Sequence, residues 1–417
     1  MGFEANDQVV SNKNKDLLIR YRMEARNELE DILDYWMRFA IDDVNGGFVG
    51  KVDHKNKIDY SAPKGAVLNS RILWTFSAAY IATRNKEYLE LADRAFDYIS
   101  KYFVDKEYGG VFWTVSEHGQ RVDTKKQIYA IAFAVYGLSE YYRASANDAA
   151  KQLAIGLYHD IVKHSHDEHF GGYLEAFTRE WKATDDLRLS EKDANEAKSM
   201  NTNLHVLEAF STLYQVWPES NLRRQIAELV ELFLNNIISN SSYHLNLFFN
   251  NAWGVKSTVI SYGHDIEAAW LIQEAVEVIN DQQLLERVKE SSLLMVQAAE
   301  EGLDSDGGIW YESDLKEEVL VKEKHWWPQA EAMVGFFNAW QLSGDEKFLG
   351  YSIRSWQFIQ RFIKDKEQGE WKWGVKADYS TMLNEDKIGL WKCPYHNSRA
   401  CMEIIKRITL SLAEGTK

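Results

Sequence analysis

The chain has 417 residues, 45% of them hydrophobic, and its 63 acidic against 48 basic residues give a formal net charge of −15. This negative charge repels nucleic acids and anionic membranes, so we exclude both as partners. No apolar run approaches the roughly 18 residues of a membrane-spanning helix, and the first residues lack the apolar core of a signal peptide. With only Cys393 and Cys401 present, we expect a cytoplasmic protein without disulfides.

A short phrase recurs along the chain: an acidic residue, then Gly-Gly, then an aromatic or aliphatic residue. Its copies begin at Asp42, Asp105, Asp167, Asp304 and, in degraded form, Asp365. The intervals between copies are 63, 62, 136 and 62 residues, counted from Gly46, Gly109, Gly171, Gly307 and Gly369. The long interval is about two periods, and residues 246–254 near its middle are interpreted as an eroded copy. We therefore predict six repeats.

Two kinds of helix alternate between these phrases. Residues 71–81 are apolar on nearly all sides, whereas residues 88–103 have one apolar stripe and a charged face. After a disordered tail over residues 1–15, we expect residues 16–417 to form a single all-α domain, an (α/α)6 barrel of six helix pairs. The glycine phrases would then form turns and short hairpins at one mouth. An open solenoid is the alternative, disfavoured because no polar capping repeat is visible.

Each predicted inner helix carries a polar or large aromatic residue near its start. In chain order these residues are Arg71, Tyr129, His205, His264, Trp327 and His396. Repeats arranged in a ring place equivalent positions at equivalent heights. We therefore expect all six side chains to meet in one cavity at one end of the barrel.

The polar members of this set are chemically informative, although a structural role is open for each. His264 and Glu267 are three residues apart, so they share a helix face, where the carboxylate can fix the histidine tautomer. His396 follows Pro394, where a helix-capping role competes. Arg71 lies among apolar residues, so its guanidinium needs an acidic partner or an anionic state of a substrate.

Other candidates line the same proposed mouth. His205 is a third buried polar intrusion, with Asn201 just before it. Trp253, Trp327 and Trp391 fall near helix starts, where aromatic faces can stack on sugar rings, with plain packing as the alternative.

Two further segments are polar but carry no expected chemistry. The histidines of residues 164–169 resemble a metal cluster by composition, but they lack ligand spacing, and we expect solvated surface and no metal site. The acidic stretch over residues 185–196 is interpreted as an exposed excursion and a candidate lid.

Two imidazoles and a guanidinium facing a sugar suit proton abstraction beside a carbonyl. An opened aldose that loses its C2 proton becomes a cis-enediolate, and reprotonation on the opposite face inverts C2. His264 and His396 fit the two acid/base roles, and Arg71 fits the enediolate oxygens. This chemistry needs no metal and no other cofactor.

Three segments carry a resemblance to a known family: S-Y-G-H-D-I-E-A-A-W-L, W-W-P-Q-A-E-A-M-V-G-F and K-C-P-Y-H-N-S-R-A-C-M-E. They look like signatures of the N-acylglucosamine 2-epimerase family, and the resemblance covers essentially the whole chain after about residue 15. It is strongest to the branch that acts on β-1,4-linked disaccharides. The resemblance implies an (α/α)6 barrel and cofactor-free conversion of cellobiose to glucosylmannose and of lactose to epilactose, with mannobiose as a further candidate substrate.

The resemblance also assigns roles by position. His264 and His396 are then the acid/base pair, and Glu267 orients His264. Arg71 and Tyr129 are expected near the reacting oxygens. The residues expected to assist ring opening or to line the sugar subsites are His205, Asn201, Trp253, Trp327 and Trp391. We expect a monomer or weak homodimer.

Four other functions remain open at this point. A mannose isomerase would deliver the proton to C1 of the same enediolate, and an N-acylglucosamine 2-epimerase would need an N-acetyl pocket and, by family resemblance, a nucleotide. An inverting glycosidase would need two opposed carboxylates, for which Glu267 and Glu331 are the candidates. A sugar-binding barrel without catalysis would not explain two facing histidines.

Overall fold

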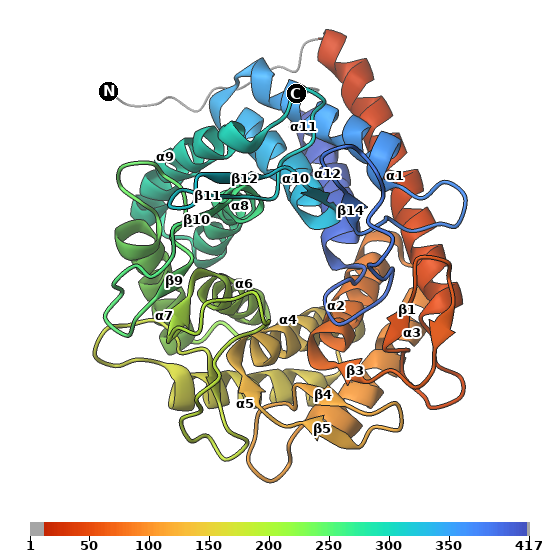
Figure 1. The fold of residues 1–417 in the computed structure, drawn as a ribbon, viewed down its shortest axis with the longest axis vertical. Helices are drawn as coiled ribbons and strands as arrows, with labels where there is room; N and C mark the ends of the chain where they lie inside the picture. Colours follow the sequence, from red (N-terminus) through yellow and green to blue (C-terminus); the bar gives the residue numbers. More distant parts are fainter. Residues whose placement is uncertain (1–11, 415–417) are drawn as a thin grey trace.

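Two concentric rings of helices build the molecule (Figure 1). The structure is a computed structural model that describes residues 12–414. The inner helices are α2 (Ala66–Thr83), α4 (Ile128–Ser145), α6 (Met200–Val216), α8 (Tyr262–Ile279), α10 (Trp326–Ser343) and α12 (Tyr395–Glu414). The outer helices are α1 (Asn12–Phe39), α3 (Lys86–Tyr98), α5 (Asp148–Ser165), α7 (Ser220–Leu232), α9 (Gln282–Ala299) and α11 (Glu346–Phe358).

The inner ring is closed. Each inner helix packs against the next, from α2 through α4, α6, α8 and α10 to α12, and α12 packs against both α1 and α2. The predicted (α/α)6 barrel is thus confirmed and the open solenoid is excluded. The disordered tail expected over residues 1–15 lies mostly outside the described residues, and residues 12–15 belong to α1. Among the described helices, none has both the length and the apolar character to cross a bilayer.

The alternation of buried and amphipathic helices follows from the sequence. Inner helix α2 is buried without interruption over residues 66–79, whereas outer helix α3 buries only one stripe. Asparagines cap the starts of outer helices: Asn85 accepts a hydrogen bond from the Glu87 backbone N–H, and Asn147 accepts one from Ala149. Such caps satisfy backbone donors that a helix start leaves unpaired.

Short elements fill the connections. Three outer helices continue into π-helical turns, η1 (Ile99–Phe103), η2 (Phe233–Ile237) and η4 (Ile359–Ile363), and α9 continues into the 3-10 turn η3 (Glu300–Gly302). The strands are β1 (Lys51–Val52), β2 (Ile58–Asp59), β3 (Lys64–Gly65), β4 (Thr114–Val115), β5 (Arg121–Asp123), β6 (Lys126–Gln127), β7 (Ala176–Phe177), β8 (Lys198–Ser199), β9 (Phe248–Phe249), β10 (Val259–Ser261), β11 (Glu312–Asp314), β12 (Val319–Val321), β13 (Lys324–His325) and β14 (Gly374–Val375). Each strand just before an inner helix, such as β3 or β6, pairs antiparallel with a strand of the following repeat, here β4 or β7.

The glycine phrases form six equivalent turns, which we call the rim turns. They span residues 42–47, 105–110, 167–172, 239–244, 304–308 and 365–370. The fourth differs from the prediction, because it lies at 239–244 and not at 246–254. Tyr243 and His244 replace the glycines there, and Tyr243 adopts the left-handed φ of 61° that Gly109 adopts at 79° in its own turn.

A buried lysine anchors most rim turns. Lys126 Nζ lies 2.9 Å from Asp105 Oδ2 and donates to the Gly109 carbonyl at 2.6 Å. The same contact between a lysine two or three residues before an inner helix and an acidic residue of a rim turn recurs at Lys64, Lys198, Lys324 and Lys392. In the fourth repeat His244 takes over, with Nδ1 2.7 Å from Asp265 Oδ2. These ion pairs hold the hairpins against the inner helices.

Candidate active site

The predicted site residues meet at the starts of the inner helices, but in two layers and not at one height. The outer layer consists of second or third helix residues: Tyr129, His264, Trp327 and His396. One turn deeper, the sixth residue of four inner helices forms the second layer: Arg71, His205, Glu267 and Glu331. The sixth residue of α4, Phe133, belongs to this layer and packs its ring 4.7 Å from that of His205.

His264 is held by a hydroxyl group. Its Nδ1 lies 2.8 Å from Ser261 Oγ, and its ring centroid lies 4.6 Å from that of Trp327. Burial lowers the pKa of His264 to about 3, and His205 adds to the shift. The imidazole is therefore neutral near pH 7, with Nε2 free to act as a base. The expectation that Glu267 orients His264 is wrong, because Ser261 occupies Nδ1.

His396 is held by a carboxylate from the neighbouring helix. Its Nδ1 lies 2.7 Å from Glu331 Oε1, and Glu267 Oε1 is 3.8 Å away. Glu331 and Glu267 each accept a hydrogen bond from Arg399 Nη2, both at 2.7 Å. The Glu267 side chain thus reaches one turn deeper, where it balances Arg399 and borders His396 instead of His264.

His205 is oriented by Glu208, one helical turn along α6. His205 Nδ1 lies 2.9 Å from Glu208 Oε2, and Glu208 Oε1 accepts hydrogen bonds from the Tyr395 hydroxyl and from Arg399. Burial lowers the pKa of His205 despite this carboxylate. Residues Glu208, Glu267, Glu331 and Arg399 form a continuous layer beneath the histidines, which we call the ionic layer.

The ionic layer holds more carboxylates than fixed cations. Burial raises the pKa of Glu267, and the neighbouring Glu331 raises it further; burial also raises the pKa of Glu331. Two carboxylates that share one guanidinium at close range cannot both ionise easily. The unit formed by His396, Glu331 and Glu267 therefore titrates as one group that retains a proton.

Arg71 projects its positive charge without a carboxylate partner among the described residues. Its Nη2 donates to the Tyr129 hydroxyl at 2.8 Å and its Nη1 to Cys393 Sγ at 3.5 Å. The guanidinium lies 4.2 Å from the ring centroid of Phe133 and 4.8 Å from that of Tyr395. At 3% exposure, such an arrangement leaves positive charge available to an anion that enters the site.

Two carboxylates of the ionic layer and the imidazole of His396 are side chains of the kinds that bind metal ions. Single ligand atoms of Glu267, Glu331 and His396 lie within 4.8 Å of one another. The Arg399 guanidinium, however, bonds both carboxylates and occupies the position that an ion would need. In the segment 164–169, the three histidine rings pack on the aromatic side chains of Trp181, Tyr173 and Phe170.

The remaining predicted residues divide into two groups. The Trp327 ring lies beside both histidines, 4.6 Å from His264 and 5.7 Å from His396, and the Trp391 ring lies 6.0 Å from that of Tyr129. Asn201, the second residue of α6, lines a small crevice with residues of the segment 187–196, and its Oδ1 is enclosed without a partner.

Trp253 lies elsewhere. Its indole N–H donates to the carbonyls of Phe170 and Gly171, and its ring covers Lys198. It stands at φ 62° in a turn that matches the one at Trp181, where φ is 63°. Trp253 therefore supports a rim turn, and none of its contacts is with the histidines.

Four residues of the site were not predicted to have these roles: Ser261, Glu208, Tyr395 and Arg399. Glu331 was considered only as a glycosidase acid. Counting residues from each helix start would have found Glu331, because it is the sixth residue of its helix, as Arg71 and Glu267 are. The sequence held no signal for Ser261, which lies just before its helix.

The fold and the site together define a closed helical barrel that gathers histidines, carboxylates and arginines at the starts of its inner helices. Residues 46–400 match the model of the family described as N-acylglucosamine 2-epimerase (GlcNAc 2-epimerase). The cellobiose 2-epimerase of Bacteroides fragilis is 47% identical over 385 residues, 92% of this chain and 98% of that protein. The structure of cellobiose 2-epimerase from Bacillus thermoamylovorans B4167 aligns with a TM-score of 0.88 at 39% identity, covering 93% of this chain and 99% of that one. A D-mannose isomerase of Marinomonas mediterranea is 21% identical over 92% of this chain and 96% of that protein. The chain belongs to the N-acylglucosamine 2-epimerase family.

Proposed function

We propose that this protein epimerises C2 of the reducing-end glucose in β-1,4-linked disaccharides, converting cellobiose to glucosylmannose and lactose to epilactose. The observation that carries the proposal is a pair of imidazoles, the half-buried His264 and the buried His396, whose rings both lie beside Trp327. The two rings lie 4.6 and 5.7 Å from its indole and are backed by different groups. Similarity to cellobiose 2-epimerases over nearly the full length of both chains supports the same substrate class.

Inversion at C2 requires one base and one acid on opposite faces of the carbon. One imidazole takes the C2 proton of the open-chain aldehyde, the C2–H electron pair becomes part of a cis-enediolate, and the other imidazole delivers a proton to the opposite face. His264 is neutral near pH 7 and suits the base. Burial, and then Arg71 and Arg399, also lower the pKa of His396, so its imidazole is neutral too. The raised pKa of the Glu267–Glu331 pair keeps a proton beside Nδ1, so His396 can give up its Nε2 proton while Nδ1 takes one from Glu331, which suits the acid; in the reverse reaction the two sides exchange roles.

The enediolate needs stabilisation beyond proton transfer, since acid–base catalysis typically contributes about 10²- to 10⁴-fold. Arg71 supplies a buried positive charge with no carboxylate to neutralise it. Such a cation has its largest effect when it stabilises negative charge that develops in a site from which water is excluded. Tyr129, fixed by Arg71, places a hydroxyl beside the same oxygens.

His205 is suited to the preceding step, the opening of the pyranose ring. Its Nδ1 is fixed by Glu208, so Nε2 can exchange a proton with a sugar oxygen. Trp327 and Trp391 are suited to stacking on the sugar rings, and Asn201, with its unpartnered Oδ1, to accepting a hydrogen bond from a sugar hydroxyl.

The rival functions are less well supported. A mannose isomerase shares the enediolate, but the identity of this chain to such an enzyme is 21%. An inverting glycosidase needs a water-activating carboxylate facing its acid across the sugar, whereas Glu267 and Glu331 lie on the same side and share Arg399.

The test is incubation of the purified protein with cellobiose in D₂O, followed by proton NMR. We expect a reducing-end mannose signal to grow while deuterium enters C2. Release of free glucose would identify a hydrolase, and formation of a ketose would identify an isomerase; either result would contradict the proposal.

A further inference from the structure

A second large cavity lies on the far side of the ionic layer from the histidines. Its volume is about 850 Å³, within the range of roughly 300–1,000 Å³ usual for small-molecule sites. Its walls are the later turns of five inner helices, α2, α4, α6, α8 and α12, together with α1 and the start of α3. We call it the rear chamber.

The position of the rear chamber follows from residue counts along the inner helices. Trp74, Tyr136 and Trp270, which line it, are each the ninth residue of their helix, one turn beyond the layer of Arg71 and Glu267. Glu208 and Arg399 also line it, so the ionic layer separates the two spaces. Ligands would therefore reach the rear chamber from the opposite end of the barrel.

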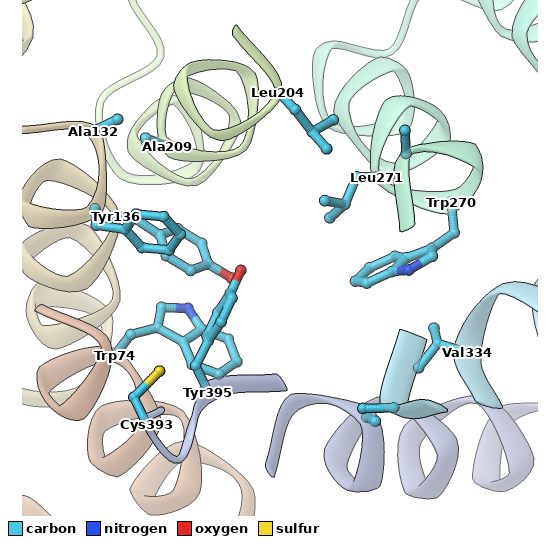
Figure 2. Packing of buried hydrophobic residues seen from close by; sticks show 14 of the residues in the cluster. Trp74, Ala132, Tyr136, Leu204, Ala209, Trp270, Leu271, Val334, Cys393 and Tyr395 are labelled. Atoms are coloured by element: carbon cyan, nitrogen blue, oxygen red, sulfur yellow. The ribbon is translucent and has the colours of Figure 1, made fainter. Parts of the chain in front are cut away.

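Aromatic rings form one wall of the rear chamber. Trp74 and Tyr136 are stacked, with ring centroids 5.2 Å apart and planes 13° from parallel. Figure 2 shows them beside Tyr395 and across from Trp270 and Leu271. The Arg399 guanidinium lies 4.3 Å from the ring centroid of Tyr395 and 4.9 Å from that of Trp270. Trp74 is 7% and Tyr136 6% exposed, so the small exposed area of each ring belongs to the chamber.

Polar groups on this wall lack partners. Among the described residues, nothing accepts a hydrogen bond from the Trp74 indole N–H, and nothing bonds the Tyr136 hydroxyl. Neither atom is among the fully enclosed polar atoms without a partner, so both are open to the chamber. A buried hydroxyl or indole N–H without a partner is costly unless water or a ligand satisfies it.

Glu274 provides an acceptor on the opposite wall. Among residues 12–414 no cation lies within ion-pair distance of it. Burial and then Glu403 raise the pKa of its carboxyl group to about 7, although Lys406 and Arg407 act in the opposite direction. The other buried acidic groups of the lining are matched by bases: Glu140 contacts Arg143 at 2.7 Å, and Glu208 contacts Arg399. The chamber therefore offers little net charge to a ligand.

We propose that the rear chamber is a second binding site, for a neutral polyhydroxylated ligand of the pyranose type. A sugar presents hydroxyl groups that both donate and accept, as the set of Trp74, Tyr136 and Glu274 requires, and C–H faces that pack on aromatic rings. A cationic ligand would face the lining arginines and Lys406, and an anionic one would face Glu274. The proposal does not depend on the epimerase activity.

The probe is methyl β-D-glucopyranoside, whose acetal prevents ring opening, so it cannot be turned over. Binding is measured by saturation-transfer NMR on three proteins: the wild type, Trp327→Ala to weaken the active-site mouth, and Trp327→Ala combined with Tyr136→Phe and Glu274→Met. We expect binding to persist in Trp327→Ala and to weaken at least about tenfold in the combined variant, since two buried hydrogen bonds are lost.

A matched control places the same two substitutions outside the chamber, as Tyr142→Phe and Glu277→Met in the Trp327→Ala background, and should bind like the parent. Thermal unfolding verifies that each variant is folded. Absence of binding to the wild type, loss of binding in Trp327→Ala alone, or unchanged binding in the combined variant would each overturn the proposal. Because the probe does not react, these outcomes are separate from any failure to epimerise cellobiose.

Discussion

The rim turns and the starts of the inner helices both recur in the six repeats. Equivalent positions mostly carry the same residue types in the rim turns and different residue types in the inner helices. At the rim, the same pair recurs: a buried lysine contacts an acidic side chain in five of the six repeats, as Lys64 contacts Asp42 at 2.8 Å. At the sixth residue of the inner helices, the side chain changes from repeat to repeat, from Arg71 through Phe133 and His205 to Glu267.

The difference separates structural from chemical roles. The rim contact keeps the same residue types in five repeats because it holds the same turn in each, whereas the inner-helix positions that meet at one place differ from one repeat to the next. Trp253 is an example of a structural residue, because it lies in a turn that recurs in the repeats and packs on Lys198 of the rim. Trp327 lies at the second residue of its helix and serves the site.

The largest expected effect is at a chemical position. Replacement of His396 by alanine should lower kcat/KM by about 10²- to 10⁴-fold, because one acid/base group is lost. His118→Ala, at a histidine whose side chain is 64% exposed, should leave the rate unchanged. Both are measured by the NMR assay with cellobiose. A loss of less than tenfold in His396→Ala would contradict the assigned role.

At the rim the same kind of substitution should act on stability instead. Lys64→Met leaves Asp42 buried without its ion-pair partner, which is expected to cost roughly 3–5 kcal/mol of unfolding free energy. The folded fraction should retain its KM. Lys51→Met is the control, because the Lys51–Asp386 pair is partly exposed and is worth about 1 kcal/mol or less. Urea unfolding distinguishes the two, and equal midpoints would mean that the rim lysines are dispensable.

A smaller effect, on KM, should distinguish Trp391 from Trp253. Trp391→Ala is expected to raise KM for cellobiose by about two- to tenfold, which corresponds to a lost stacking contact of about 0.5–1.5 kcal/mol. Trp253→Ala should lower the melting temperature and leave KM unchanged. If Trp253→Ala raised KM as much as Trp391→Ala does, the division between rim and site would fail at this residue.

The smallest effect is expected on the acid side of the pH profile. Burial depresses the folded-state pKa of His264 to about 3, so the basic form persists as the pH falls through 6.5. We expect kcat/KM to change less than about twofold between pH 7 and pH 5, whereas the neutral fraction of a solvated histidine would fall about 25-fold.

The same lowered pKa makes the folded protein less stable as the pH falls below 6.5. The unfolded chain takes up a proton near pH 6.5 that folded His264 does not, so this contribution to stability is lost as the pH falls from 6.5 towards 3. Initial rates must therefore be measured over short times, and circular dichroism verifies that the protein remains folded at each pH. An acid limb centred near pH 6.5 would show that the histidine is hydrated.

The fold and the residues of the candidate site could be predicted from the sequence better than the hydrogen bonds between those residues. Regular spacing and apolar helices define a closed barrel, and buried polar residues at helix starts mark its site. The partner of His264 could not be read in this way. Spacing within one helix places Glu267 on its face, but only the packed neighbours show that Arg399 claims that carboxylate.

The fourth rim turn was missed for a related reason. Tyr243 takes a left-handed φ, which is rare for a bulky residue, so no glycine marked the position. Asn250 and Gly254 marked a different turn instead.

Helix α12 closes the barrel against α1 and α2, and it also carries His396 and Arg399. The ribosome therefore makes Glu208, Glu267 and Glu331 well before their cation. Until α12 emerges, these three carboxylates lack Arg399, the guanidinium that each of them contacts in the folded protein. One helix thus closes the ring and also supplies the counter-charge for acidic side chains that three earlier helices contribute.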